Sequence, residues 1–340
     1  MRSDAFAGVE RSMLLSTRAL VERGHDVSVV GGEREQMTAV LSELGVSWSA
    51  AASFRDVVRE LRRLGRADIV HAHMTAAECA AIVSRHVNGG ALVMTRHFAQ
   101  RRGRSLPGRL AAVLIDRVRH TDLAISQFVA DTVGSTHVVY HGIDDRPAIS
   151  GQSRRIAIIQ RLEPEKDTAF ALRAWERSGL GDEGWELVVA GDGSERAQLE
   201  ALAKGGGSAP SVRFLGRVDD VDALRATAVL QLAPPRNEHF GLSVLEAMAV
   251  GLPVLAADSG AHRELIGSDH PELFFGPGDA GDAARRMREL VSNEHLRAQL
   301  GSELRHRQQE RFSLAAHGRA LEDAYRLAIA QQARHGGRRR

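Results

Sequence analysis

Short apolar runs alternate with longer amphipathic stretches along the whole chain. The runs are rich in Val, Ile and Leu and predict buried strands, and the stretches between them have the apolar spacing of helices. The predicted strands of the first half are residues 27–31, 68–72, 92–95, 123–125 and 137–140. Those of the second half are residues 155–159, 187–190, 212–214, 229–232, 254–256 and 273–275. Strands that alternate with helices predict an α/β protein with parallel, doubly wound sheets.

A segment of turn-forming residues, 141–153, divides this pattern into two halves. We therefore expect a Rossmann-like domain at residues 1–145 and a second one at 153–313, facing each other across a cleft. We expect a last helix, 314–332, to cross back to the first domain, followed by a basic tail at 333–340. Ligands bind such sheets at the carboxyl ends of the strands, so the cleft is the expected active site.

The composition is that of a globular protein of two domains, with 340 residues of which 43% are hydrophobic. The single cysteine, Cys79, excludes a disulfide framework and a cysteine-based zinc site. It also fits a reducing compartment, and we expect a cytoplasmic protein. No apolar run reaches the length of about 18 residues that a transmembrane helix needs.

The charge balance is close to neutral over most of the chain. Lys and Arg total 45 against 43 for Asp and Glu, and the last seven residues alone hold four arginines. Aromatic residues make up only 4%, so the sequence lacks the basic patches with stacking aromatics that are typical of nucleic-acid binding. We expect no nucleic-acid partner.

Residues 236–260 carry the most informative motif. Gly241 lies at a predicted strand-to-helix turn, where a glycine lets ligand atoms approach the backbone. The first N–H groups of the helix that follows, on Leu242, Ser243 and Val244, would bind an anion such as phosphate.

Glu238 and Glu246 lie on either side of that turn, eight positions apart. Glu246 lies one helical turn in, where its carboxylate would accept hydrogen bonds from the vicinal hydroxyls of a ribose. Eight residues of helix span roughly 12 Å, whereas the paired carboxylates of a glycoside hydrolase lie about 5–9.5 Å apart. A hydrolase pair is therefore not indicated. The alternative interpretation is an ordinary amphipathic helix with two solvated glutamates.

A second motif pairs Arg161, at the end of a predicted strand, with Lys166, at the start of a predicted helix. A guanidinium and an ammonium at the carboxyl end of a strand suit a diphosphate. Lys166 is one of only two lysines among 45 basic residues, which indicates a specific need for a compact ammonium. The alternative is a pair of surface cations neutralised by Glu163 and Glu165.

The first half of the chain offers two further candidates. Gly8 opens a predicted helix, so the loop before it could lie against a phosphate or an acceptor. His97 ends a predicted strand and would donate to a sugar hydroxyl or a developing charge, with a structural histidine as the alternative. We interpret His71 and His73 as packing or cleft-lining residues, because no third ligand lies at metal-binding spacing, and we expect no metal.

Together these segments resemble glycosyltransferase family 4, whose GT-B fold has two facing Rossmann-like domains. The resemblance extends over nearly the whole chain, and its most specific part is EHFGLSVLEAMAVGLPVLA, residues 238–256. The shorter matches are FAGVER, DIVHAH, TRHF, DLAISQFVAD, YHGID, QRLEPEKD, LVVAGDG, VRFLGRV and FFGPGD.

The resemblance implies transfer of a sugar from a nucleotide diphosphate donor, a UDP- or GDP-sugar, with retention of anomeric configuration, as a hexosyltransferase of EC class 2.4. By position, Arg161 and Lys166 would bind the diphosphate and stabilise the leaving charge. Glu246 would hold the donor ribose, and Glu238 would bind the hydroxyls of the transferred sugar, with His97 reaching that sugar from the other domain. No cofactor and no divalent metal are implied. The other implied contacts are those of Gly8 with the donor phosphate and of Phe240, Gly241, Leu242 and Ser243 with sugar and phosphate.

The chain departs from the family pattern at its start. The family begins with a buried strand before the glycine loop, and here only MRSDAF precedes that loop. Loss of this strand would leave two neighbouring strands unpaired. Our hypothesis is that the native chain starts further upstream.

Two other functions stay open. One is a GT-B sugar-nucleotide epimerase, which would form product without an acceptor, and the other is a catalytically impaired homologue that acts as a binding protein. The expected acceptor is a lipid, a glycan or a small metabolite. Arg101, Arg102 and Arg104 would favour an anionic acceptor or peripheral contact with the inner face of the cell membrane, and a solvated basic loop is the alternative.

Overall fold

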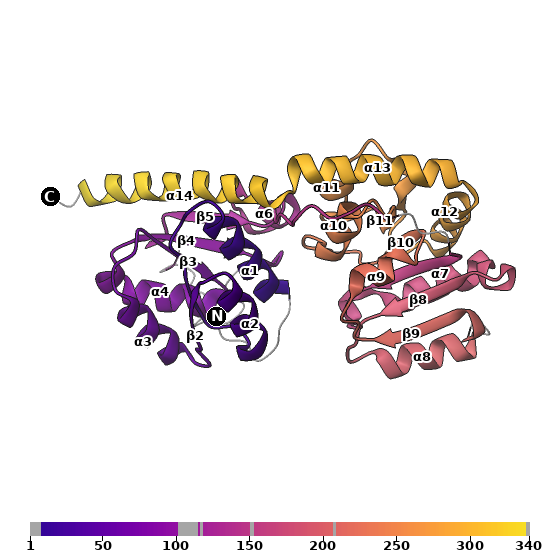
Figure 1. Ribbon diagram of the computed structural model, residues 1–340, viewed down its shortest axis with the longest axis horizontal. Helices are drawn as coiled ribbons and strands as arrows, with labels where there is room; N and C mark the ends of the chain where they lie inside the picture. The colour runs from indigo at the N-terminus through magenta and orange to yellow at the C-terminus, as the bar shows by residue number, and fades with distance from the viewer. Residues whose placement is uncertain (1–7, 101–114, 116–117, 150–152, 207–208, 338–340) are drawn as a thin grey trace. The chain divides into compact units, whose positions relative to one another are not determined.

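The computed structural model forms two compact units (Figure 1). The first unit comprises residues 1–142 and 314–340, and the second comprises residues 143–313. The structure describes residues 8–100, 115, 118–149, 153–206 and 209–337.

The second unit is built on a sheet of six parallel strands in the order β12-β11-β10-β7-β8-β9. The chain runs outward from β7 to β9, returns to β10 beside β7, and then runs outward in the opposite direction. The carboxyl ends of β7 and β10 are therefore the point at which the strand order reverses, where sheets of this kind bind ligands. The strands are β7 (Arg155–Ile159), β8 (Glu186–Ala190), β9 (Val212–Gly216), β10 (Leu230–Ala233), β11 (Val254–Ala257) and β12 (Phe274–Phe275).

Helices cover both faces of this sheet. Because crossovers between parallel strands are right-handed, helices that lead outward in opposite directions lie on opposite faces. In one group α7 packs against α8 and α12, and in the other α10 packs against α11 and α13. Their bounds are α7 (Thr168–Ser178), α8 (Arg196–Gly205), α9 (Val221–Ala226), α10 (Leu242–Ala249), α11 (His262–Ile266), α12 (Ala280–Ser292) and α13 (Glu294–Arg311). The 3₁₀ turns are Pro164–Lys166, Leu180–Glu183, Ala209–Ser211 and Pro271–Leu273.

The centre of this sheet is apolar and buried. Ile156 and Ala157 of β7 and Leu230 of β10 are fully buried. Strands covered on both faces need continuous apolar runs rather than alternation, which is why the hydrophobic pattern alone locates them.

The first unit contains two parallel sheets among its described residues, β3-β4-β5-β6 and β1-β2. The strands are β1 (Ser28–Val30), β2 (Ser47–Ser49), β3 (Ile69–His73), β4 (Ala91–Arg96), β5 (Thr121–Ala124) and β6 (His137–Val138). The helices are α1 (Gly8–Val21), α2 (Arg34–Glu43), α3 (Phe54–Leu64), α4 (Thr75–Asn88), α6 (Gln127–Val133) and α14 (Leu314–Gly337). The hydrophobic pattern does not predict β2, because its Ser-Trp-Ser sequence contains no apolar run.

The break between these two sheets lies between β1 and β3, at the position where the sequence analysis expected two neighbouring strands to lack the first strand of the family pattern. In the common doubly wound strand order 3-2-1-4-5-6, the first strand lies between the second and the fourth. In this order β1 corresponds to the second strand, β2 to the third and β3 to the fourth. No strand among the described residues corresponds to the first strand, which would lie between β1 and β3. Among the described residues β1 therefore pairs only with β2, and β3 only with β4.

The long helix α14 covers one face of the four-stranded sheet. Leu321 and Ala328 of α14 are buried in one cluster with Ala91 and Val93 of β4, and Figure 1 shows the helix running along β4 and β5. The helix extends to Gly337, five residues beyond the end that the sequence indicated.

A buried leucine of the central strand tests the packing of the second unit. We expect Leu230→Ala to lower the free energy of unfolding of this unit by about 2–5 kcal/mol, because the side chain is fully buried and leaves a cavity. The matched control is Leu202→Ala on α8, where the side chain is 39% exposed and the expected loss is about 0.5 kcal/mol. Urea unfolding followed by fluorescence of Trp175 and Trp185, both in the second unit, measures both. Equal losses for the two variants would contradict this account of the core.

Candidate active site

The loops that follow β7 and β10 are joined by a partly buried ion pair. Lys166 ends the 3₁₀ turn after β7, and Glu238 lies between β10 and α10. Lys166 Nζ lies 2.6 Å from Glu238 Oε2, and the two side chains are 20% and 13% exposed. Burial alone would raise the pKa of Glu238, but the charges of Lys166 and His262 hold that pKa below its usual value. An ionised carboxylate and an ammonium thus lie together at the point where the strand order reverses.

Neighbouring residues hold the backbone around Lys166. Gln160 Nε2 donates to the Lys166 carbonyl oxygen at 2.9 Å. Asp167 has a φ of 50°, a conformation that is uncommon outside glycine, and its carboxylate accepts a hydrogen bond of 2.8 Å from Arg236 Nε. The ammonium is therefore presented by a loop with a defined conformation.

Gly260 lets the loop after β11 approach the loop of Glu238. A Cβ atom on Gly260 would lie 2.5 Å from the Glu238 carbonyl oxygen, and Ala261 N donates to that oxygen at 2.9 Å. The backbone of Glu238 is therefore supported from a third strand of the sheet.

Arg161 has a different environment from Lys166. It follows β7 by two positions, and its Nη2 lies 2.6 Å from Glu165 Oε1, with both side chains more than half exposed. Exposed ion pairs contribute little to stability, so an incoming diphosphate could replace Glu165 as the partner of this guanidinium at small cost.

Gly241 is the N-cap residue of α10 and has a φ of 101°, which favours glycine. The first α-helical hydrogen bond runs from Leu245 N to the Gly241 carbonyl oxygen. The N–H groups of Leu242, Ser243 and Val244 lie ahead of this bond, at the helix end, where an anion is favoured.

The side chains of Phe240 and Ser243, at the start of this helix, make contacts within the protein. The Phe240 ring is buried, so this residue can offer a ligand its backbone. Ser243 Oγ donates to the Ile159 carbonyl oxygen at 2.7 Å and so ties α10 to the end of β7. At this turn, the groups suited to phosphate are therefore the backbone N–H groups.

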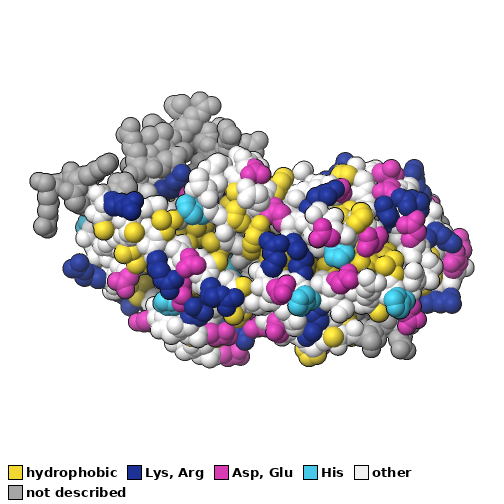
Figure 2. Space-filling model, turned by 90° about the horizontal axis from the view of Figure 1, so that it is seen from above, with side chains coloured by type: hydrophobic (Ala, Val, Ile, Leu, Met, Phe, Trp, Pro, Cys, Tyr) yellow, Lys and Arg dark blue, Asp and Glu magenta, His cyan; other side chains and the backbone are white. Residues whose placement is uncertain are grey.

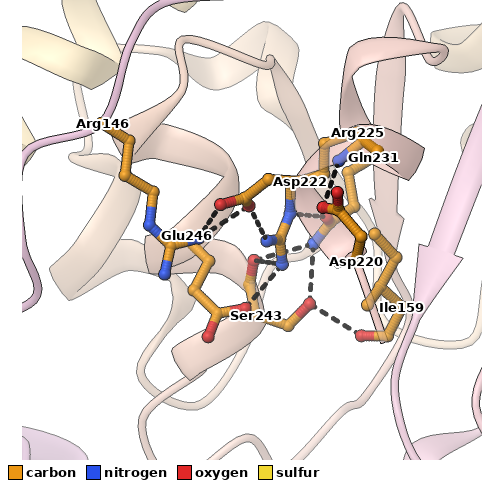
Figure 3. Close-up of polar contacts among 9 residues, drawn as sticks. Arg146, Ile159, Asp220, Asp222, Arg225, Gln231, Ser243 and Glu246 are labelled. Carbon is orange, nitrogen blue, oxygen red and sulfur yellow. Dashed lines mark hydrogen bonds and ion pairs between the residues drawn. The ribbon is translucent and has the colours of Figure 1, made fainter. Parts of the chain in front are cut away.

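Glu246 is buried on α10 and pairs with an arginine that the sequence analysis missed. Its Oε2 lies 2.6 Å from Nη2 of Arg225, which is fully buried on α9 (Figure 3). Since Glu238 and Glu246 are both largely buried, the alternative of two solvated glutamates is wrong. The available signal for Arg225 was an arginine within the otherwise apolar run ALRATAVL.

In the first unit, buried histidines gather at the carboxyl ends of β3 and β4. His97, directly after β4, places Nε2 2.8 Å from His73 Nδ1. The His141 ring stacks on His97 with 6.1 Å between centroids, and His317 of α14 lies edge-on to His141 at 5.8 Å. His71, on the same edge, places Nε2 2.6 Å from a threonine hydroxyl of β4. His97 and Gly8, the first residue of α1, therefore both belong to this unit.

Burial keeps these imidazoles neutral at pH 7. It lowers the pKa of His71 to about 3 and the pKa values of His97 and His317 to about 4. Within the part of the chain that the structure describes, no three His, Cys, Asp or Glu residues are arranged to hold a metal ion. The cluster can therefore offer a ligand neutral donors and acceptors.

The second unit has a hollow of about 460 Å³. Arg173 and Arg177 of α7 and Arg236 line it, together with Asp279. The site residues that the sequence predicted are not among those that line it.

Two family models match adjoining parts of the chain. The model described as Glycosyltransferase Family 4 matches residues 6–146, and the model described as Glycosyl transferases group 1 matches residues 143–307. The chain belongs to glycosyltransferase family 4. It is therefore a glycosyltransferase of the hexosyltransferase class, EC 2.4, with the two Rossmann-like domains of the GT-B fold.

Individual relatives agree with this assignment. The glycosyltransferase is 26% identical over 330 residues to the phosphatidyl-myo-inositol mannosyltransferase of Mycolicibacterium smegmatis, with 87% of this chain and 84% of the relative covered. It is 22% identical to an uncharacterized glycosyltransferase of Haemophilus influenzae, with coverages of 90% and 92%. The crystal structure of HepE from Anabaena with UDP and glucose superposes with a TM-score of 0.80 at 18% identity, covering 95% of this chain and 97% of that one.

The predicted site residues of this glycosyltransferase divide between its two units. Those brought to the ends of β7 and β10 are Arg161, Lys166, Glu238, Phe240, Gly241, Leu242, Ser243 and Glu246. Gly8 and His97 lie in the first unit. Arg101, Arg102 and Arg104 lie outside the described residues. None of the described helices has the length and apolar character needed to cross a membrane.

The buried histidines predict that the stability of the first unit depends on pH. Their folded pKa values lie below the ordinary histidine pKa of 6.5, so unfolded chains bind protons first as the pH falls. Stability is complete above pH 6.5 and should be lost between about pH 6.5 and 4, by about 1.4 kcal/mol per pH unit for each histidine.

His317→Gln should reduce the pH dependence of the free energy of unfolding by the contribution of one histidine, about 1.4 kcal/mol per pH unit. Urea unfolding followed by circular dichroism between pH 7 and 4.5 measures this dependence. The control is His86→Gln on α4, where the side chain is exposed. If both variants keep the slope of the parent chain, the buried histidines do not determine the pH dependence.

Proposed function

We propose that this glycosyltransferase moves a hexosyl group from a nucleoside diphosphate sugar, a UDP- or GDP-sugar, to an acceptor hydroxyl with retention of anomeric configuration. In the reaction the bond between the sugar C1 and the diphosphate oxygen breaks and a bond from C1 to the acceptor oxygen forms. Negative charge collects on the diphosphate, which takes up the proton that the acceptor hydroxyl loses. The observation that carries the proposal is the contact of 2.6 Å between Lys166 and Glu238 at the ends of β7 and β10.

The chemistry of this pair suits a leaving diphosphate. An ammonium that is already oriented and partly buried stabilises charge that develops in the transition state, since it needs little reorganisation. Arg161 and the N–H groups at the start of α10 add positive charge at the same edge of the sheet. In this proposal these groups carry the stabilising role that a divalent metal has in other transferases.

Each carboxylate has a distinct proposed role. Glu246, one turn into α10, accepts hydrogen bonds from the vicinal hydroxyls of the donor ribose. Glu238 accepts hydrogen bonds from the hydroxyls of the transferred sugar while it holds Lys166 in place. The contacts of His97 with the sugar and of Gly8 with the donor phosphate stay predictions from the family resemblance.

The relatives support a nucleotide-sugar donor and leave a choice of acceptor. One relative is named as a mannosyltransferase that acts on phosphatidyl-myo-inositol, and the HepE crystals contain UDP and glucose. We propose a lipid, a glycan or a small metabolite as the acceptor, with the enzyme in the cytoplasm and in peripheral contact with the inner face of the cell membrane. Figure 2 shows basic and acidic side chains side by side on the face that it draws, so a membrane contact there would not rest on a field of one sign.

Nucleotide binding gives the first test. We expect one of UDP, GDP, ADP and dTDP to raise the midpoint of thermal unfolding, because a ligand at 100 times its dissociation constant adds about 2.7 kcal/mol. The shift should be the same with and without EDTA. A chain that unfolds cooperatively and responds to none of the four would contradict the proposed donor class, and a shift abolished by EDTA would contradict metal independence.

Glu238→Gln and Lys166→Met test the ion pair. We expect each to lower kcat by about 10²–10³-fold, the cost of removing one preorganised charge at a transition state. The measurement is release of the nucleoside diphosphate from the donor sugar in the presence of acceptor. Glu165→Gln is the matched control from the same loop, because Glu165 is exposed, and it should keep most of the activity. Wild-type rates for Glu238→Gln and Lys166→Met would remove the ion pair from the mechanism.

A further inference from the structure

A fully buried arginine lies between two acidic side chains beside the candidate donor site (Figure 3). Arg225 Nη1 lies 3.0 Å from Asp222 Oδ1, and Nη2 lies 2.6 Å from Glu246 Oε2. Arg225 cannot lose its charge in a protein, and a buried charge must be compensated. The two carboxylates compensate it from both sides, so the position of Glu246 is linked to that of Arg225.

The same guanidinium contacts the start of α10. Arg225 Nη2 donates to the Ser243 carbonyl oxygen at 3.5 Å, and Nε donates to Gln231 Oε1 at 3.4 Å. Gln231, on β10, in turn donates through Nε2 to the Ser243 carbonyl oxygen at 3.0 Å and to Ser243 Oγ at 3.2 Å. Arg225 therefore contacts both the helix end suited to phosphate and the carboxylate suited to ribose.

The network continues to the surface through Asp222. The Asp222 side chain is 45% exposed, and Arg146 Nη1 donates to its two oxygens at 2.7 and 2.9 Å. Charges thus alternate from Arg146 through Asp222 and Arg225 to Glu246. Arg225 alone is completely withdrawn from water, so it has the least freedom to move.

We propose that Arg225 is a positioning residue of the donor site. It holds the Glu246 carboxylate in the geometry that binds the ribose hydroxyls. The proposal rests on the proposed function, in which Glu246 binds the donor ribose. It adds that this recognition needs a preorganised carboxylate, since a group held in one orientation loses less entropy when the ligand binds.

The choice of ligand separates positioning from a general structural role. We would measure the dissociation constants of UDP and 2′,3′-dideoxy-UDP by calorimetry, or of GDP and 2′,3′-dideoxy-GDP if GDP is the nucleotide that stabilises the chain. The ratio of the two constants reports contacts to the ribose hydroxyls only. Hydrogen bonds to a charged group make this ratio about 10 or more in the parent chain.

Arg225→Met should bring the ratio close to 1, as should Glu246→Gln, while affinity for the dideoxy nucleotide stays within about twofold of the parent. Arg225→Lys keeps the charge but cannot contact Asp222 and Glu246 through two separate nitrogens, so it should give an intermediate ratio. Asp222→Asn acts on Arg225 from its exposed side and should lower the ratio by about two- to threefold. The matched control is Arg155→Met, which removes an Arg–Glu pair of 2.6 Å elsewhere in the same unit and should leave the ratio unchanged.

Each outcome decides the question. Equal weakening of both nucleotides by Arg225→Met, with the ratio kept, would show a structural role only and overturn the proposal. If circular dichroism shows that Arg225→Met does not fold, Arg225→Lys and Asp222→Asn decide it by the same ratio. A parent chain that binds both nucleotides equally would overturn the ribose role of Glu246, and the proposal with it, while leaving nucleotide binding intact. A parent chain that binds neither nucleotide would overturn the proposed function itself.

Discussion

The parallel pairing of β7 with β10 is the contact on which the second unit depends. These strands are far apart in the sequence, and their register joins Ile156 with Leu230 and Ala157 with Gln231. Because both strands are parallel, the loops that leave them emerge at the same edge of the sheet. One loop carries Lys166 and the other carries Glu238, so the pairing of two apolar strands brings two opposite charges into contact.

Once the charges meet, electrostatics defines the local structure. A partly buried carboxylate without a partner would be costly, and a buried guanidinium cannot shed its charge, so Lys166–Glu238 and Arg225–Glu246 each require an intact pair. The pairs lie on either side of the start of α10, whose N–H groups face the same edge. Under the proposed function, such a site is oriented for a diphosphate and vicinal hydroxyls before the ligand binds, which is the condition for efficient charge stabilisation.

The first unit presents a different chemistry to its ligands. Burial lowers the pKa values of His71, His97 and His317, so their imidazoles are neutral at pH 7. Neutral imidazoles donate and accept hydrogen bonds without adding charge. In the proposed reaction, positive charge for the diphosphate comes from groups of the second unit. The cost of this arrangement is stability that falls as the pH falls, because the folded state resists protonation of these rings.

The sequence by itself determined the features that depend on neighbouring residues. Apolar runs located eleven of the described strands in outline, Gly241 marked the turn into α10, and the order of the motifs indicated the family. It could not determine contacts between residues far apart in the chain, because spacing along a chain does not state which strands lie side by side. The pairing of Lys166 with Glu238, 72 positions away, and the burial of Glu246 against Arg225 were decided only by the tertiary structure. The reason is the same in each case: charge compensation and strand pairing depend on distance in space, which the sheet topology sets.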